Sequence, residues 1–132
     1  MGRGTAAPNF FKKETTMATC KALIIPVDQS QPVRVESIAA DLESLQHLVR
    51  GNIEAVSGDD WHFYLNEEGK ILGLEPNIRA GALVLQLNGD LHDVYCGDVV
   101  FLGETPDGDE ADVPDNVRFL AALIIGAAQT AA

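Results

Sequence analysis

Hydrophobic and polar residues alternate in ways that predict strands along much of the chain. Residues 21–27 are almost continuously apolar, which is typical of a strand buried on both faces near the centre of a sheet. Residues 32–38 alternate between apolar and polar positions, the period of a strand with one wet face. We therefore expect 32–38 to pair with 21–27 as a hairpin.

Four later segments predict further strands. Residues 53–56 precede a polar turn, and Trp61, Phe63 and Leu65 then alternate with polar partners over 61–66. Residues 91–95 predict a short strand. The four apolar residues 99–102, which end at a glycine, predict a buried one.

Helical spacing appears in three places. After Asp41, a typical N-cap residue, Leu42, Leu45, Leu48 and Val49 form one apolar stripe, and Gly51 is expected to end this helix in the left-handed conformation. A second helix is predicted from Ile78 to about Leu87. A third is predicted to open at Pro114, where proline fits the first helical turn.

The second helix has its own start signal. Pro76 forces Glu75 out of the helical region, and Asn77 is a favourable N-cap. Upstream, Asn66 to Gly69 predicts a type I turn in which Gly69 takes a positive φ, with 70–72 returning as the second arm of a hairpin.

These elements predict a single small α+β domain. It has about six or seven short strands and about three helices, without a regular βαβ alternation or an internal repeat. We expect a curved, mostly antiparallel sheet or a partly open barrel.

Several segments occur in an order that resembles one family. They are residues 21–26, 42–46, 51–56, 65–83 and 97–100. In this order they are similar to the DUF3846 family, an uncharacterised small domain of actinobacteria, their plasmids and their phages. The resemblance covers roughly Cys20 to Gly103. Gly81 and Arg50 depart from it, since a small polar residue and a glycine are expected there. The family implies no activity, so no catalytic residue is transferred.

Composition narrows the class of partner. The 132 residues are 46% hydrophobic and carry a formal net charge of −11. An acidic chain is unsuited to phosphate backbones, so we expect no direct nucleic-acid binding. No apolar run approaches a membrane span, and the longest, 119–128, is too short. The charge favours a basic protein partner.

The first sixteen residues differ from the rest. Lys13-Glu14-Thr15-Thr16 before Met17 is compatible with a translated ribosome-binding sequence, so we expect Met17 to be the true start and 1–16 to be a disordered leader. A genuine N-terminal tail is the alternative. Arg3, Lys12 and Lys13 against Glu14 give this segment a net charge of +2, which leaves −13 on residues 17–132. Without a signal peptide, we expect the host bacterial cytoplasm.

Recognisable catalytic patterns are missing from the sequence. The two cysteines stand alone, and there is no nucleophile elbow, phosphate loop or dinucleotide fingerprint. The three histidines do not have ligand spacing, and we expect His62 to pair with Tyr64 on the polar face of its strand. We therefore predict a protein that is not an enzyme and needs no cofactor or metal.

The acidic stretch 104–112 begins like a calcium loop at Asp107. It lacks the glycine at the sixth position, and its twelfth position is Arg118. We expect an exposed, irregular loop.

Two hypotheses for function follow. The first is an accessory protein of a phage or mobile element that binds a host protein through its acidic surface. The second is a module for a small anion or nucleotide-like ligand, using the aromatic strand 61–66 and the helix start 77–79. The candidate binding residues are Trp61, Tyr64, Asn66, Glu68, Asn77 and Arg79.

Overall fold

Seven strands form one open, mixed sheet in the computed structural model, which describes residues 19–130. The strands are β1 (Thr19–Ile25), β2 (Arg34–Ala39), β3 (Ile53–Ser57), β4 (Trp61–Asn66), β5 (Val99–Glu104), β6 (Glu110–Ala111) and β7 (Gln129–Thr130). Their order is β3–β4–β5–β1–β2–β7, with β6 beside β5. Neighbouring strands are antiparallel except β2 and β7. The sheet does not close, so of the two expected arrangements the open sheet is the one observed.

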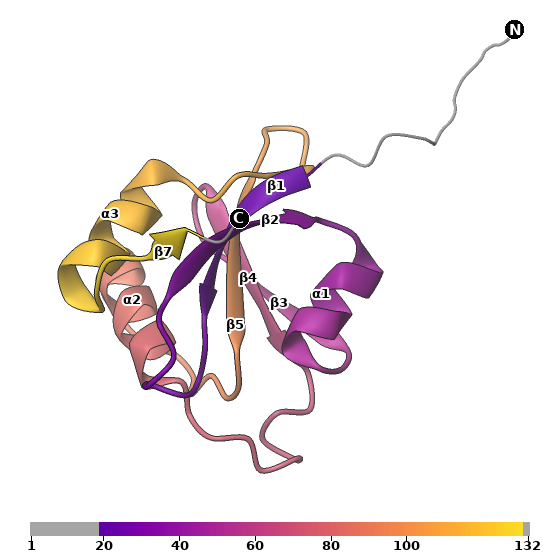
Figure 1. Ribbon diagram of the computed structural model, residues 1–132, viewed down its shortest axis with the longest axis vertical. Coiled ribbons are helices and arrows are strands. Elements are labelled where there is room, and N and C mark those ends of the chain that lie inside the picture. The colour runs from indigo at the N-terminus through magenta and orange to yellow at the C-terminus, as the bar shows by residue number, and fades with distance from the viewer. Residues whose placement is uncertain (1–18, 131–132) are drawn as a thin grey trace, which may run out of the picture.

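Three helices cover the two faces of this sheet unequally. Helices α2 (Ile78–Asn88) and α3 (Asp115–Ile124) lie on one face, and α1 (Leu42–Val49) lies on the other (Figure 1). The prediction of a small α+β domain with about three helices and six or seven strands is confirmed. Strand β5 is buried at every residue from Val99 to Gly103 because both its faces are covered.

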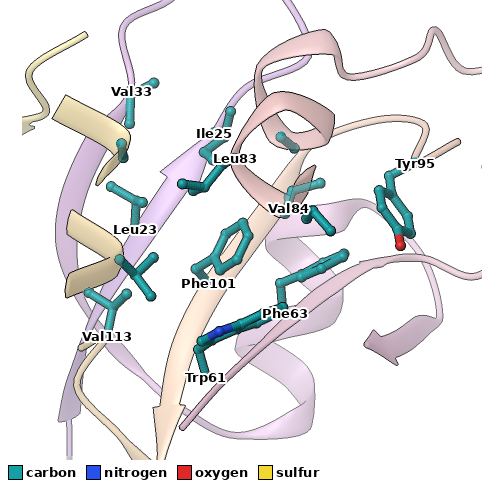
Figure 2. Close-up of a cluster of buried hydrophobic side chains, with 14 of the residues drawn as sticks. Leu23, Ile25, Val33, Trp61, Phe63, Leu83, Val84, Tyr95, Phe101 and Val113 are labelled. Atoms are coloured by element: carbon teal, nitrogen blue, oxygen red, sulfur yellow. The ribbon is translucent and has the colours of Figure 1, made fainter. Parts of the chain in front are cut away.

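The larger core lies between the sheet and the α2–α3 layer (Figure 2). Phe63 of β4 is 4.9 Å from Phe101 of β5 between ring centroids, and Trp61 is 5.8 Å from Phe101. Leu83 and Val84 of α2 are fully buried against these rings. The smaller core, under α1, includes Ala22, Ile24, Leu45, Val49, Val100 and Leu102.

Several local predictions are confirmed. The Asp41 carboxylate accepts a hydrogen bond from the Ser44 amide at 2.8 Å, and the Asn77 side chain accepts one from the Ala80 amide at 3.0 Å. Each residue therefore caps its helix as predicted. Helix α3 begins directly after Pro114.

The end of α1 differs from the prediction. Arg50, rather than Gly51, takes the left-handed conformation, with φ 63°. The adjacent glycine has another role: a Cβ on Gly51 would lie 2.7 Å from Nδ2 of Asn66. Glycine at 51 is needed for this close approach and not for its φ.

The turn after β4 also differs. The Gly69 amide donates to the Asn66 carbonyl at 3.1 Å, and the Glu68 amide donates to the Asn66 side chain at 2.8 Å, so the turn itself is confirmed. Gly69 is not among the glycines with positive φ, so that part of the prediction is wrong. Residues 70–72 form further turns instead of a second hairpin arm.

Two other segments correct the sequence interpretation. Residues 91–95 were expected to be a strand, but only the next residue, Cys96, makes an isolated bridge, to Pro76. The acidic stretch 104–112 is not wholly irregular, because Glu110–Ala111 pairs with β5 as β6. Both departures depend on contacts with residues far away in the sequence. The proposed leader, residues 1–16, lies outside the described residues.

Candidate functional site

The residues predicted to enclose a ligand lie apart from one another. Trp61 is 3% exposed and belongs to the core beneath α2, where Figure 2 shows its ring beside Phe63 and Phe101. Tyr64 alternates to the opposite face of β4, in the cluster under α1. Arg79 donates hydrogen bonds to the carbonyls of Pro26 and Asp28 at 2.7 and 3.1 Å. The structure does not bring these three side chains together.

The two candidate asparagines are occupied by the protein's own backbone. Nδ2 of Asn66 donates to the carbonyls of Val49 and Arg50, both at 3.2 Å. Nδ2 of Asn77 donates to the carbonyls of Ile25 and Gly97 at 2.8 and 2.9 Å. Both side chains are buried and fasten neighbouring segments to each other. Glu68 is exposed in the turn after β4.

An apolar groove runs along α2 beside residues 91–95. Its volume is about 330 Å³. It is lined by Pro76, Asn77, Ile78, Gly81, Ala82, Leu85, Leu91, Asp93, Val94 and Tyr95. Four of these are large apolar residues at the surface: Ile78, Leu85, Leu91 and Val94 are 60%, 43%, 44% and 52% exposed. Such a concentration of exposed apolar side chains around a concave surface is a typical mark of an interaction site.

Gly81 stands in the lining of this groove, inside α2. A Cβ at this position would meet only Cδ2 of Leu91, at 3.9 Å, so packing does not require glycine. Glycine in a helix interior costs about 1 kcal/mol relative to alanine. The groove is therefore wider than a more stable helix would leave it.

One acidic residue lines the apolar groove, and two others stand next to lining residues in the sequence. Asp93 lines the groove and forms an ion pair with Lys70. This hydrogen bond from the Lys70 ammonium lowers the pKa of Asp93, so its carboxylate is charged at neutral pH. Glu75 and Asp90, both exposed, lie at either end of the α2 segment. The groove is apolar, and the one carboxylate in its lining, that of Asp93, is ion-paired.

A polar cluster on the other face of the sheet contains the expected partners His62 and Tyr64 together with Glu110, which was not expected there. Nε2 of His62 lies 2.6 Å from Oε1 of Glu110, and the Tyr64 hydroxyl donates to the other oxygen of the same carboxylate. Nδ1 of His62 lies 3.4 Å from Glu104. The expected direct pair of His62 and Tyr64 is instead an edge-to-face ring contact at 5.2 Å, and Glu110 bridges the two.

Burial shapes the chemistry of this cluster. Burial raises the pKa of Tyr64, and the hydrogen bond to Glu110 and the charges of Glu110 and Glu104 raise it further. Tyr64 is therefore a persistent donor to Glu110 at neutral pH. In the described part of the chain, no group of three or more His, Cys, Asp or Glu side chains is arranged to hold a metal ion. The cluster attaches β6 to β4.

One protein-family model matches the sequence over most of its length. The model for a domain of unknown function, DUF3846, matches residues 20–124. The chain belongs to the DUF3846 family. The matched range contains every residue of the α2 groove and of the His62 cluster. The predicted family resemblance is thus confirmed.

One solved structure shows what the DUF3846 fold is similar to. The crystal structure of the small RNA methyltransferase HEN1 matches with a TM-score of 0.55 and 16% sequence identity. The match covers 82% of this chain but 16% of the HEN1 chain, so this chain corresponds to a small part of that protein. At this identity the likeness concerns the fold alone. No curated protein sequence is significantly similar to this chain.

Sequence reasoning missed the α2 groove for an identifiable reason. The predicted strand at 91–95 would have placed Leu91 and Val94 within the sheet. In the structure this segment instead lies along α2 and leaves both side chains half exposed. The one sequence feature that could have indicated the groove was Gly81, a glycine in the middle of the predicted second helix. No helix within residues 19–130 has the length and apolar character needed to cross a membrane.

Proposed function

We propose that this DUF3846 domain is a non-enzymatic accessory protein of a phage or another mobile element, and that it acts in the bacterial cytoplasm by binding a host protein. The observation that supports this proposal is the groove between α2 and residues 91–95. It is concave, apolar and formed by side chains that are otherwise unfavourably exposed to water.

The charge of the domain defines the chemistry of the partner. The whole chain carries −11, Asp93 lines the groove, and the exposed Glu75 and Asp90 are the sequence neighbours of the lining residues Pro76 and Leu91. A complementary segment offers one or two large apolar side chains with lysine or arginine on either side. The apolar side chains supply affinity, and the basic residues raise the association rate and select the partner.

The test has two steps, identification of the partner and mapping of its contact. A photoreactive amino acid in place of Ile78, which is 60% exposed at the groove, is expected to crosslink to a host protein through a basic and apolar segment. The affinity of the purified partner is then measured for variants of the groove. Leu85→Glu is expected to weaken binding at least about tenfold, equivalent to about 1.4 kcal/mol.

Two further variants separate binding from stability. Gly81→Leu fills the groove while improving helix propensity, so it is expected to lose binding without losing stability. Leu123→Glu makes the same chemical change on the neighbouring helix α3, at a side chain that is 66% exposed, and should leave affinity unchanged. An equal loss of affinity from Leu123→Glu, or a crosslinked segment without basic residues, would refute the proposed groove interaction.

A small-ligand function is the second candidate. The aromatic strand 61–66 and the helix start 77–79 do not form its site. Trp61 is buried in the core, and the Asn77 side chain makes its hydrogen bonds within the protein. The observation that favours a small ligand lies elsewhere, in a polar hollow beside the turn that joins β1 to β2.

A further inference from the structure

The polar hollow lies between the β1–β2 turn and the C-terminal end of α1. Its volume is about 550 Å³, within the range of sites for small metabolites. It is lined by Pro26, Val27, Asp28, Gln31, Arg34, His47, Leu48, Arg50 and Asp98. Two guanidinium groups and an imidazole thus border one concave surface.

This gathering of cations is unusual for so acidic a chain. The described residues contain six lysines and arginines, which are Lys21, Arg34, Arg50, Lys70, Arg79 and Arg118. Arg34 and Arg50 line the hollow, and Arg79 is anchored to the carbonyls of Pro26 and Asp28 at its edge. Half of the basic side chains therefore lie at one end of the sheet.

The two acidic residues of the hollow are held by the protein's own donors. Oδ1 of Asp98 accepts the Val27 amide at 2.8 Å. Oδ1 of Asp28 accepts both the amide and the hydroxyl of Ser30, at 2.9 and 2.7 Å. These carboxylates stabilise the turn, and their remaining oxygens can accept hydrogen bonds from hydroxyl groups of a ligand.

Arg50 supplies an independent observation. Within residues 19–130 it is the one non-glycine residue with a positive φ, 63°. Glycine adopts this conformation freely, whereas a residue with a Cβ is strained there. Strained backbone of this kind clusters at functional sites, which makes Arg50 a candidate for a functional role.

The helix terminus itself does not repel an anion strongly. The C-terminal end of a helix is negative because its last carbonyls lack partners. Here the Arg50 and Gly51 amides donate to the Gln46 carbonyl, and Asn66 donates to the carbonyls of Val49 and Arg50. The carbonyls of Gln46, Val49 and Arg50 thus have donors, and the charged groups that line the hollow are the guanidinium groups of Arg34 and Arg50 and the carboxylates of Asp28 and Asp98.

We propose that this hollow binds the phosphate group of a small phosphomonoester that also carries hydroxyl groups, such as a sugar phosphate or a nucleoside monophosphate. Arg34 and Arg50 line the hollow and can offer guanidinium groups to the phosphate oxygens, although Nε of Arg34 already donates to Glu36 at 2.9 Å. His47 adds a third nitrogen donor, and Asp28 and Asp98 accept from the hydroxyl groups. This site is separate from the α2 groove and does not depend on it.

The test is a titration of the isotopically labelled full-length protein with ribose 5-phosphate, adenosine monophosphate, inorganic phosphate and unphosphorylated ribose. We expect amide shifts confined to residues near 26–31, 47–51 and 98 with the two phosphomonoesters, and none with ribose. Inorganic phosphate alone should bind more weakly. Shifts with inorganic phosphate equal to those with both esters would indicate an adventitious ion only, and no shift with either ester at millimolar concentration would likewise refute the site.

Variants distinguish a ligand site from ordinary capping of the helix. Arg50→Gly relieves the backbone strain, so its melting temperature should not fall, yet ester affinity should drop at least about tenfold. Arg34→Gln, on β2 and distant in sequence from α1, should also weaken binding tenfold. Arg118→Gln on α3 removes the same charge elsewhere and should leave affinity unchanged. Unchanged affinity in Arg50→Gly and Arg34→Gln, or an equal loss in Arg118→Gln, would overturn the proposal.

Discussion

Gly69 shows how one residue can be required for a reason different from the one its sequence context indicates. The turn from Asn66 to Gly69 predicts a positive φ at the glycine. The structure instead places Gly69 against Cys96, whose carbonyl oxygen would lie 3.0 Å from an added Cβ. The requirement is for close approach between two segments, which a local sequence pattern does not reveal.

Gly69→Ala is accordingly expected to destabilise the domain by about 1 kcal/mol, because the Cys96 backbone must shift to admit a methyl group. Glu68→Ala is the matched control, since Glu68 is exposed and surface substitutions change stability by no more than about 0.5 kcal/mol. Thermal melts of both variants beside the parent measure the difference. Equal melting temperatures for all three proteins would contradict the predicted role of Gly69.

Helix caps were the most predictable residues. Asp41 and Asn77 carry the chemistry that a free amide at a helix start requires, and that chemistry is local. Arg50 was unpredictable by the same reasoning, because glycine is the usual residue in the left-handed conformation and Gly51 stands next to it.

At the level of elements, Asn77 joins α2 to two strands. Its side-chain oxygen caps the helix at the Ala80 amide, while its amide group donates to Ile25 at the end of β1 and to Gly97 just before β5. Asn77→Ala is expected to cost about 2–4 kcal/mol, because a cap is lost and two carbonyls are left without a donor in a buried site. Urea denaturation measures this loss.

Asn77→Asp separates the two roles of this side chain. Aspartate keeps the cap but replaces a donor to two carbonyls with a buried carboxylate, so it should destabilise the domain at neutral pH nearly as much as alanine. Wild-type stability in Asn77→Asp would show that the cap alone matters. Sequence predicted the first role of Asn77, and only tertiary structure revealed the second.

The strands also divide into those that local sequence predicts and those that depend on tertiary contacts. The positions of β1, β2 and β5 were predictable from their hydrophobic patterns. A strand buried on both faces is almost continuously apolar, as β1 and β5 are, and a strand buried on one face alternates, as β2 does. The segment 91–95 was misassigned because short apolar runs do not distinguish a strand from a loop that packs on a helix. Strand β6 pairs with β5, and its Glu110 side chain also contacts His62 and Tyr64 of β4, which are 48 and 46 positions away.

At the scale of the whole molecule, four described groups that lose a proton at high pH have raised pKa values. One is the exposed Lys70, whose hydrogen bond to Asp93 is the largest cause, and the other three are a thiol and two phenols. Burial is the largest cause for Cys20, Tyr64 and Tyr95, whose ordinary pKa values are 9.0, 10.0 and 10.0, and neighbouring carboxylates contribute to each shift. The folded chain therefore retains protons that the unfolded chain releases. Their contribution to stability is fully present below the ordinary values and is lost as the pH rises above about 9.

The free energy of unfolding is thus expected to be level near pH 8 and to fall between pH 9 and 11, as urea denaturation at each pH would show. Repulsion acts in the same direction, because a chain of net charge −11 becomes more negative as these groups ionise. Tyr64→Phe isolates one contribution, since it keeps the ring in place and removes the hydroxyl that donates to Glu110. This variant should be less stable than the parent at pH 8 and should lose less stability on going to pH 11. An unchanged slope in Tyr64→Phe would assign the alkaline loss to other groups, and a wild-type curve that stays level to pH 11 would contradict the buried, protonated state of all three side chains.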